Sequence, residues 1–552
     1  MIKKLFNSRS KTITSAAIIL AAASLTSQFL GLMRDRILAG RFGAGDELDI
    51  YFASFRVPDL IYNLLVVGAL TAGFIPVFTS YLNKKKLESP RSVLGQLSED
   101  RPRTDDHWYL ANDLLNIVGF GLVIACGLAA IFASRIVPLI APGFDPQKIH
   151  QTINLTRIIF LSPIFLGISG VFSGISQSFK HFIAFSLAPI FYNLGIIFGA
   201  LFLTKYFGIY GLGFGVIIGA FLHMLVQILP VASFGWRYQF ILDFKNKGIR
   251  RIGKLMIPRT FSLGLSQLNF LALTIIASTL ASGSLAVFNF AYNIYTFPLG
   301  LVAGSFAIAA FPTLTHWAHR KDWPNFIKSF SSAFRQILFF LLPAGALFIV
   351  LRAQIVRVIL GTGRFNWNDT ILTINALQFL TLGLFADGLV LLLIRGFFAL
   401  EDTKTPFVLG IFDTLVRIAC AYIFARYFGV AGLAIGFTFG CVVYFILLWF
   451  FLQRKVGDLD KRAIFSSTIK ILIASIFAGL AAYATLHIFA NLVNMKTLLG
   501  IFTQGLVAGL SGIFAYIIAG LALRSEEMQS FWQTFTHRLP WAKVAPKEEI
   551  IS

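Results

Sequence analysis

Residues 27–36 read Ser-Gln-Phe-Leu-Gly-Leu-Met-Arg-Asp-Arg, and a Gly-rich turn at residues 40–45 separates them from a second apolar run that extends to residue 76. This second run carries Asp49 and Arg56. A charge near the centre of a bilayer costs about 2.5–3.5 kcal/mol on insertion scales, so it persists only where it faces a partner, a bundle interior or a watery cavity. Arg34, Asp35, Asp49 and Arg56 therefore predict a polar substrate site on the first two helices. The alternative is that these charges lie at helix ends and anchor them.

The composition identifies the class of protein. Of the 552 residues, 57% are hydrophobic and 13% are charged, and the mean hydropathy is +0.77. Soluble proteins are nearer one-quarter charged. The formal charge of +22 would suggest a nucleic-acid partner in a soluble chain, but here its distribution matters more, and no such partner is expected. Three cysteines lie in apolar runs without metal-ligand spacing, so neither a metal site nor a disulfide framework is predicted.

Apolar runs of about 20 residues, the length that spans a bilayer, recur throughout the chain. They predict an all-α polytopic membrane protein with about fourteen transmembrane helices. The expected spans are residues 13–38, 48–82, 108–140, 152–178, 183–204, 209–234, 255–281, 285–316, 327–351, 371–400, 405–427, 430–452, 464–489 and 498–523.

Lys and Arg alternate between the loops. Basic clusters occupy residues 3–11, 84–103, 237–254, 320–321 and 454–462, whereas the intervening loops hold single lysines such as Lys148, Lys205 and Lys496. Cytoplasmic loops of membrane proteins carry the excess of Lys and Arg. Both termini are therefore predicted to be cytoplasmic.

The chain also repeats itself. Residues 68–76 read Gly-Ala-Leu-Thr-Ala-Gly-Phe-Ile-Pro, and residues 304–312 read Gly-Ser-Phe-Ala-Ile-Ala-Ala-Phe-Pro. The offset is 304 − 68 = 236 residues, and six helices separate the two copies, so the halves would share one orientation. Transporters with such parallel repeats bind cargo between the halves. A chance match of small residues is the alternative.

Several motifs resemble the MviN/MurJ family. They are residues 31–35 (Gly-Leu-Met-Arg-Asp), 42–45 (Phe-Gly-Ala-Gly), 55–58 (Phe-Arg-Val-Pro), 141–144 (Ala-Pro-Gly-Phe), 258–260 (Pro-Arg-Thr), 281–284 (Ala-Ser-Gly-Ser), 361–365, 395–399 (Arg-Gly-Phe-Phe-Ala) and 402–406 (Asp-Thr-Lys-Thr-Pro). The resemblance covers nearly the whole chain in order. It implies membership of the multidrug/oligosaccharidyl-lipid/polysaccharide exporter superfamily and flipping of lipid II, the undecaprenyl-pyrophosphate-linked peptidoglycan precursor, to the outer leaflet of the bacterial inner membrane.

The same resemblance implies a domain organisation. It comprises an N-terminal lobe of six helices (1–235), a C-terminal lobe (236–455) around a shared central cavity, two extra helices (456–523) that form a lipid groove, and a cytoplasmic tail (524–552). The tail is expected to be flexible. A membrane potential or a coupling ion would drive transport by a monomer in contact with membrane lipids. Nothing resembles a nucleotide-binding loop, and neither catalytic residues nor a cofactor are expected.

A pyrophosphate suits arginine, whose planar and permanently charged fork matches phosphate oxygens. Arg34, held by Asp35, is the first candidate to contact it. The other predicted substrate-binding residues are Asp49, Arg56, Arg259, Arg364 and Arg395. Asp413 and Arg417 are four residues apart, and we expect them to neutralise each other on one helix face.

The chain departs from the family pattern at positions where other members carry charges. Gln28 stands where an arginine is usual, and Asn293 and Thr296 replace charged residues of the eighth helix. The alternatives to lipid II flipping are therefore another lipid-linked oligosaccharide flippase or a drug antiporter of the same superfamily. A third alternative is a non-transporting scaffold in which aromatic residues fill the cavity. A membrane glycosyltransferase is disfavoured because no acidic cluster lies at an expected interface.

Overall fold

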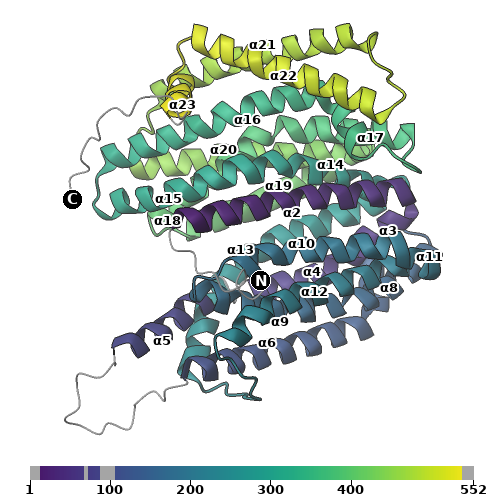
Figure 1. Ribbon diagram of the computed structural model, residues 1–552, viewed down its shortest axis with the longest axis vertical. Coiled ribbons are helices and arrows are strands. Elements are labelled where there is room, and N and C mark those ends of the chain that lie inside the picture. Colours follow the sequence, from purple (N-terminus) through teal and green to yellow (C-terminus); the bar gives the residue numbers. More distant parts are fainter. Residues whose placement is uncertain (1–12, 68–72, 88–105, 538–552) are drawn as a thin grey trace. The chain divides into compact units, whose positions relative to one another are not determined.

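A computed structural model describes residues 13–67, 73–87 and 106–537, and every regular element within them is a helix (Figure 1). The predicted all-α class is confirmed. Contacts group these helices into two compact units. Unit 1 comprises residues up to Phe290 together with 359–369 and 421–433, and unit 2 comprises the remainder. The lobe boundaries inferred from the resemblance stay a prediction.

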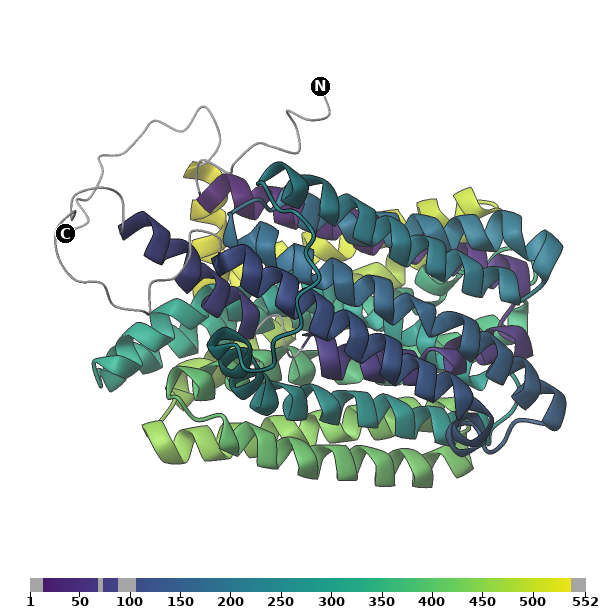
Figure 2. The same ribbon diagram turned by 90° about the horizontal axis from the view of Figure 1, so that it is seen from below.

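Unit 1 holds most of the N-terminal helices. They are α2 (Ile13–Phe42), α3 (Asp46–Ser54), α4 (Arg56–Tyr62), η1 (Asn63–Val67), α5 (Ile75–Leu87), α6 (Asp106–Ile131), α7 (Ala133–Ile140), α8 (Pro146–Ile159), α9 (Leu161–Ser178), α10 (Ile183–Phe198), η3 (Gly199–Leu203), α11 (Thr204–Phe207), α12 (Tyr210–Ser233) and α13 (Lys247–Ser278). Figure 2 shows the long helices of this unit running side by side, and α12 packs against both α9 and α10.

Glycines bring α10 and α12 into backbone contact. A Cβ atom added at Gly195 would lie 2.3 Å from the Cα of Gly219, and one at Gly199 would lie 2.5 Å from the Cα of Gly215. Small residues spaced four apart allow membrane helices to approach this closely, and packing rather than the hydrophobic effect then holds them together. This glycine seam, residues 195, 199, 211, 215 and 219, fixes the position of α10.

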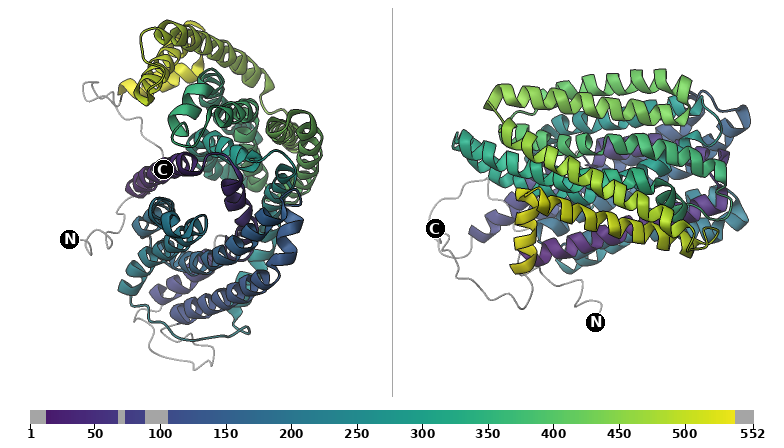
Figure 3. Two further views of the ribbon diagram at one scale, coloured as in Figure 1. Left: turned by 90° about the vertical axis from the view of Figure 1, so that its right-hand side faces the viewer. Right: turned by 90° about the horizontal axis from the view of Figure 1, so that it is seen from above.

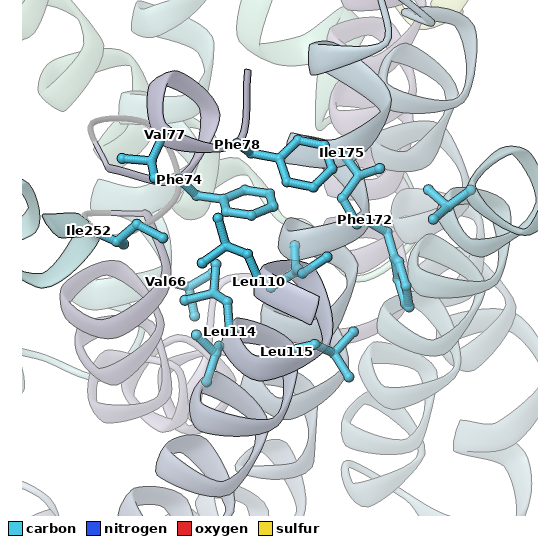
Figure 4. Close-up of a cluster of buried hydrophobic side chains, with 14 of the residues drawn as sticks. Val66, Phe74, Val77, Phe78, Leu110, Leu114, Leu115, Phe172, Ile175 and Ile252 are labelled. Carbon is cyan, nitrogen blue, oxygen red and sulfur yellow. The ribbon is translucent and has the colours of Figure 1, made fainter. Parts of the chain in front are cut away.

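An aromatic core fills the space between α5, α6 and α9. Figure 4 shows Phe74 and Phe78 facing Ile175 and Leu110, all of them buried. The two phenylalanine rings lie 5.0 Å apart. A Cβ at Gly174 would lie 2.7 Å from the Phe74 ring, so glycine leaves the space that this ring occupies.

Helix α8 begins earlier than the expected boundary at residue 152. Asp145 is its N-cap, and its carboxylate accepts the backbone N–H groups of Gln147 and Lys148, while Pro146 occupies the first helical turn. An acidic N-cap followed by proline is a strong start signal, and the cap is worth about 1 kcal/mol. Lys148, which was predicted to lie in an outer loop, is consequently a buried residue in the first turn of α8.

Helix α14 (Ser284–Pro298) begins in unit 1 and ends in unit 2, and the later helices belong mainly to unit 2. They are η4 (Leu299–Gly304), α15 (Ser305–His319), α16 (Trp323–Ile359), α17 (Trp367–Leu382), α18 (Leu384–Ala399), α19 (Lys404–Phe428), α20 (Val430–Val456), α21 (Lys461–Ala490), α22 (Leu498–Ala522) and α23 (Glu526–His537). Figure 3 shows α21 and α22 running along each other, with α23 at the end of the pair.

The C-terminal tail is more ordered than expected. Residues 526–537 form α23, which Arg335 of α16 joins by ion pairs to Glu526 and Glu527, both at 2.7 Å. The Phe531 ring lies 6.1 Å from that of Phe339. The expectation of a flexible tail is therefore wrong for this segment, because its acidic first turn and aromatic face both find partners on α16. Residues 538–552 lie outside the described part.

The number of spans is close to the prediction. Among the described residues, eleven helices are long and apolar enough to cross a membrane, and the bent pair α17–α18 makes a twelfth. Helices α2 and α13 cover the remaining two expected spans. The count of fourteen stays a prediction.

Two π-helical turns match the predicted repeat. η1 begins at Asn63 and η4 at Leu299, and 299 − 63 = 236 is the offset found in the sequence. Each π-helix follows an α-helix of one repeat and precedes the segment with the repeated Gly-to-Pro pattern, although residues 68–72 of the first copy lie outside the described residues. The shared backbone irregularity supports a true repeat.

Candidate functional site

Arg34 is held on two sides within unit 1. Its Nε and Nη2 atoms donate to Oδ1 of Asp35 at 3.0 and 2.8 Å, and its Nη1 donates to Oδ1 of Asn193 on α10 at 3.1 Å. These bonds use three of the five N–H donors of a guanidinium. The Arg34 side chain is 22% exposed whereas that of Asp35 is 3% exposed. The arginine thus keeps two donors for another acceptor while its neighbour orients it.

Asn193 is oriented in turn by the backbone. Its Nδ2 donates to the carbonyl of Pro189 at 3.1 Å and to that of Ser27 at 3.4 Å, which leaves its Oδ1 to accept from Arg34. The bond to Ser27 joins α10 to α2, and the glycine seam fixes α10 from its other side. The position of the Arg34 guanidinium therefore depends on three helices.

Two tyrosines lie near this cluster. Tyr51 of α3 and Tyr192 of α10 both lie close enough to Arg34 to interact with it electrostatically, and Asp59 of α4 acts on both tyrosines. Aromatic hydroxyls and charged groups together form a polar patch within otherwise apolar helices. We call these five residues, Arg34, Asp35, Tyr51, Asp59 and Tyr192, the polar patch of unit 1.

Arg56 reaches α13 and α14. Its Nε donates to Oγ1 of Thr274 at 2.7 Å and its Nη2 to Oδ1 of Asn289 at 2.9 Å, and its guanidinium lies 5.7 Å from the centre of the Phe270 ring. Both acceptors are neutral, so these bonds orient the guanidinium without cancelling its charge. Asp59, three residues along the chain, acts on Arg56 electrostatically.

Asp49 is buried and accepts hydrogen bonds from backbone N–H groups at the start of α14. Its Oδ2 accepts the backbone N–H of Gly283 at 2.8 Å and its Oδ1 that of Ala286 at 2.9 Å, and Lys148 of α8 donates to it at 2.9 Å. A carboxylate at a helix N-terminus satisfies otherwise unpaired N–H groups and complements the helix dipole. Asp49 joins three elements of unit 1, and these contacts use both of its oxygens.

Gly283 allows this arrangement for two reasons. Its φ of +85° is a conformation that favours glycine, and its Cα lies close to the backbone of Ala44. A Cβ at Gly283 would lie 1.9 Å from the carbonyl oxygen of Ala44.

Arg364 lies on the loop between α16 and α17. Its side chain is 72% exposed and lies 3.9 Å from the carboxylate of Glu47. Its backbone N–H donates to the carbonyl of Gly40 at 2.8 Å, so the loop is fixed against the end of α2. The exposed side chain itself is only loosely constrained.

The remaining predicted residues lie elsewhere. Arg395 of α18 is part of unit 2, where its guanidinium lies 5.3 Å from the centre of the Phe311 ring. Arg259 is on α13, but its side chain falls outside the described residues. Asp413 and Arg417 form the expected pair, with Nε bonded to both carboxylate oxygens at 2.8 and 2.9 Å, so that prediction is confirmed.

Two of the positions that depart from the family pattern, Asn293 and Thr296, are neighbours on α14. The Thr296 hydroxyl donates to the carbonyl of Asn293 at 3.0 Å. Tyr295 is buried in unit 2, where its hydroxyl donates to Asp387 at 3.1 Å. Two asparagines of unit 1, Asn193 and Asn289, accept hydrogen bonds from Arg34 and Arg56. The sequence did not predict them as partners, because each lies more than 150 residues from its arginine.

Comparisons with known proteins agree on one family. The family model for the lipid II flippase MurJ matches residues 38–503. A probable lipid II flippase MurJ of Buchnera aphidicola subsp. Acyrthosiphon pisum is 28% identical over 528 residues, which are 92% of this chain and 97% of the relative. A probable lipid II flippase MurJ of Rhizobium tropici is 31% identical over 400 residues, which are 70% of this chain and 71% of that protein.

Solved structures share the fold. A structure of the lipid II flippase MurJ in an inward closed conformation superposes with a TM-score of 0.74 at 23% identity and covers 92% of this chain and 99% of its own. An inward-facing multidrug-resistance MATE transporter of the MOP superfamily gives a TM-score of 0.64 at 18% identity and covers 80% of this chain and 99% of its own. Because the family model spans most of the chain, this protein belongs to the lipid II flippase MurJ family.

Proposed function

We propose that this protein flips lipid II from the inner to the outer leaflet of the bacterial inner membrane by alternating access, and that Arg34 contacts its pyrophosphate. Family membership over residues 38–503 supports the cargo. The geometry of Arg34 supports the contact, because Asp35 and Asn193 orient the guanidinium and leave it two donors. A part-exposed arginine with spare donors suits a bidentate phosphate contact.

The other predicted residues take different roles in this proposal. Arg56 supplies a second positive charge, held by the neutral Thr274 and Asn289. Asp49 positions the start of α14 and does not touch cargo, because Lys148 and two backbone N–H groups occupy it. Arg259, Arg364 and Arg395 remain candidates for contact at other stages of transport.

The membrane setting follows from the family and the apolar helices, which make this a multi-pass protein of the bacterial inner membrane. We further propose cytoplasmic termini, a monomer, and transport driven by the membrane potential or a coupling ion rather than by chemistry on the cargo. The distribution of Lys and Arg among the loops supports the orientation. A scaffold without transport is the second candidate, because Asn293 and Thr296 lack the charges usual on this helix.

Depletion and rescue tests this proposal. The chain is supplied to a bacterium whose own lipid II flippase can be switched off, alongside Arg34→Ala, Arg34→Lys and Arg41→Ala, with membrane levels of all four verified. We expect rescue by the natural chain and by Arg41→Ala, failure of Arg34→Ala, and partial rescue by Arg34→Lys, which keeps charge without the fork. Arg41 is the matched control because it lies two turns along the same helix and, among the described residues, hydrogen-bonds only to the carbonyl of Leu201.

The outcomes separate the candidates. Rescue by Arg34→Ala as strong as that by the natural chain would remove the phosphate contact while leaving the flippase. No rescue by the well-inserted natural chain would favour another lipid-linked sugar or the scaffold.

A further inference from the structure

Unit 2 contains a cavity of about 430 Å³ between α15 and α16. It is lined by Phe306, Ala309, Ala310, Thr313, Lys328, Ser329, Ser332, Ala333 and Gln336. Its size is within the range of about 300–1,000 Å³ typical of small-molecule sites. None of these residues belongs to the polar patch or to the other predicted substrate-binding residues.

The polar side chains of this cavity have no partners within the described part of the chain. Lys328, Ser329, Ser332, Thr313 and Gln336 make no hydrogen bond or ion pair with any described residue. Other hydroxyls on the same two helices do have partners, since Ser305 and Thr315 bond to carbonyls of the preceding turn.

The neighbouring face of α16 shows the contrast. Ser331 donates to Asp460 at 2.9 Å, and Arg335 pairs with two glutamates of α23. Ser331 and Nη1 of Arg335 thus have protein partners, whereas the polar groups that line the cavity have none among the described residues. The lining therefore offers an ammonium, three hydroxyls and one amide to a ligand.

The chemistry of the lining favours an anion. One ammonium, three hydroxyls and one amide surround the space, and the lining contains no carboxylate. Ammonium and hydroxyl donors are suited to phosphate oxygens. The rest of the lining is apolar, with three alanines and Phe306, whose ring stacks at 5.7 Å on Phe340. The site thus offers donors for a charged head and an apolar wall for what is attached to it.

We expect the Lys328 end of the cavity to lie at the depth of lipid headgroups. Helix α16 has 37 residues, whereas about 20 suffice to cross the hydrocarbon. Lys328 is five residues after Trp323, the first residue of α16, or about 8 Å along the axis. Tryptophans and basic residues near helix ends mark the membrane interface. Figure 1 also shows the turn between α15 and α16 at the same end of unit 2 as α23.

We propose that this cavity binds the phosphate of an anionic phospholipid of the surrounding bilayer. Lys328 pairs with the phosphodiester, Ser329, Ser332 and Thr313 donate to its oxygens, and the alanines with Phe306 contact the glycerol and the first methylenes. Basic pockets between membrane helices bind anionic headgroups in this way. The site is separate from the flipped cargo and would anchor α15 and α16 to the leaflet.

Native mass spectrometry of the purified full-length protein tests this site. The protein is titrated with phosphatidylglycerol or with phosphatidylcholine of the same acyl chains, and the first lipid adduct is quantified. We expect a preference for phosphatidylglycerol that falls about fivefold in Lys328→Ala, the loss expected for one basic residue. The double variant Ser329→Ala/Ser332→Ala should lose severalfold with no change in charge.

Two matched controls sharpen the result. Arg320→Gln removes an exposed charge from the turn between α15 and α16, and Ser331→Ala removes a hydroxyl that bonds to Asp460; both should retain the adduct. Equal losses in Arg320→Gln and Lys328→Ala, or equal binding of the two phospholipids, would overturn the site. Displacement of phosphatidylglycerol by equimolar undecaprenyl pyrophosphate would assign the cavity to the cargo and overturn the phospholipid assignment.

Discussion

Asp49 is a buried charge whose observed contacts all lie within the protein. One carboxylate accepts two backbone N–H groups of α14 and the ammonium of Lys148. Asp46 also accepts from Lys148, at 2.6 Å, but its own side chain is 58% exposed. The two acids thus share a partner and differ in burial.

This difference predicts unequal costs. Asp49→Ala leaves two N–H groups without an acceptor and weakens a buried ion pair, so we expect a loss of about 3 kcal/mol in the free energy of unfolding. Asp46→Ala should cost less than about 1 kcal/mol, because exposed pairs contribute little. Reversible unfolding in mixed micelles measures both, and equal losses would contradict the assignment of Asp49 to the helix start.

At this scale the sequence predicted contacts between residues that are close along the chain, and it missed contacts that form only on folding. Arg34, Asp35 and the Asp413–Arg417 pair were found because their partners lie within four residues along the chain. Asn193, Thr274 and Lys148 were missed as partners because they approach only after folding, and asparagine and threonine leave no charge signal in an apolar helix.

Among the helices, the glycine seam holds α10 against α12, and α10 carries Tyr192 of the polar patch. Gly195 and Gly219 meet backbone to backbone, so neither side can give way by moving a side chain. The same helix α10 carries Asn193, which holds Arg34.

Gly195→Ala should therefore destabilise the protein by about 1–3 kcal/mol through overpacking and reduce rescue in the depletion strain. Gly121→Ala on α6 is the control, because a Cβ there meets nothing within 4 Å and alanine favours the helix. Thermal unfolding in detergent compares the two. A Gly195→Ala protein as stable as the natural chain would mean that the helices can separate without loss.

The attachment of α23 to α16 should depend on pH. Hydrogen bonding and attraction by Arg335 lower the pKa of Glu526 below its ordinary value. A carboxyl whose pKa is lowered by folding stabilises the folded state above its ordinary pKa, and this contribution is lost as the pH falls through the folded value. We expect the protection of amide hydrogens in α23, taken relative to the intrinsic exchange rate at each pH, to fall below about pH 4.5.

Glu526→Gln should reduce this pH dependence, and Arg335→Gln should accelerate exchange in α23 at neutral pH as well. The natural chain supplies its own reference in α22, whose exchange should not follow the titration. Acceleration of the same size in both helices would indicate general unfolding instead of release of α23.

For the whole molecule, the charge of the loops predicts the orientation. Alkaline phosphatase fused after Ser282 or after Lys496 should be active, because it would be exported, and fusions after Lys247 or Ser552 should be inactive. Full-length expression of each fusion is verified by immunoblot. Activity of the fusion at Ser552 would place the C-terminus outside and contradict the prediction.

The helical class and the positions of most helices were the parts best predicted from the sequence. Apolar runs of bilayer length determine where helices form, and the loop between α13 and α14 ends at Gly283, within the predicted 281–284 segment. Boundaries failed where local chemistry extends a helix into water, as Asp145 and Pro146 do for α8. The ordered α23 was missed because its stability comes from α16 and not from its own mixed composition.

The π turns at Asn63–Val67 and Leu299–Gly304 bear on how the two copies of the repeat can bend. A π turn closes its hydrogen bonds one residue further along the chain than an α turn, and such turns are frequent at functional sites in helices. Because the two turns stand 236 residues apart, as the repeated segments do, a bend at one of them has a counterpart in the other copy. We therefore expect the two copies to be able to bend at the same place.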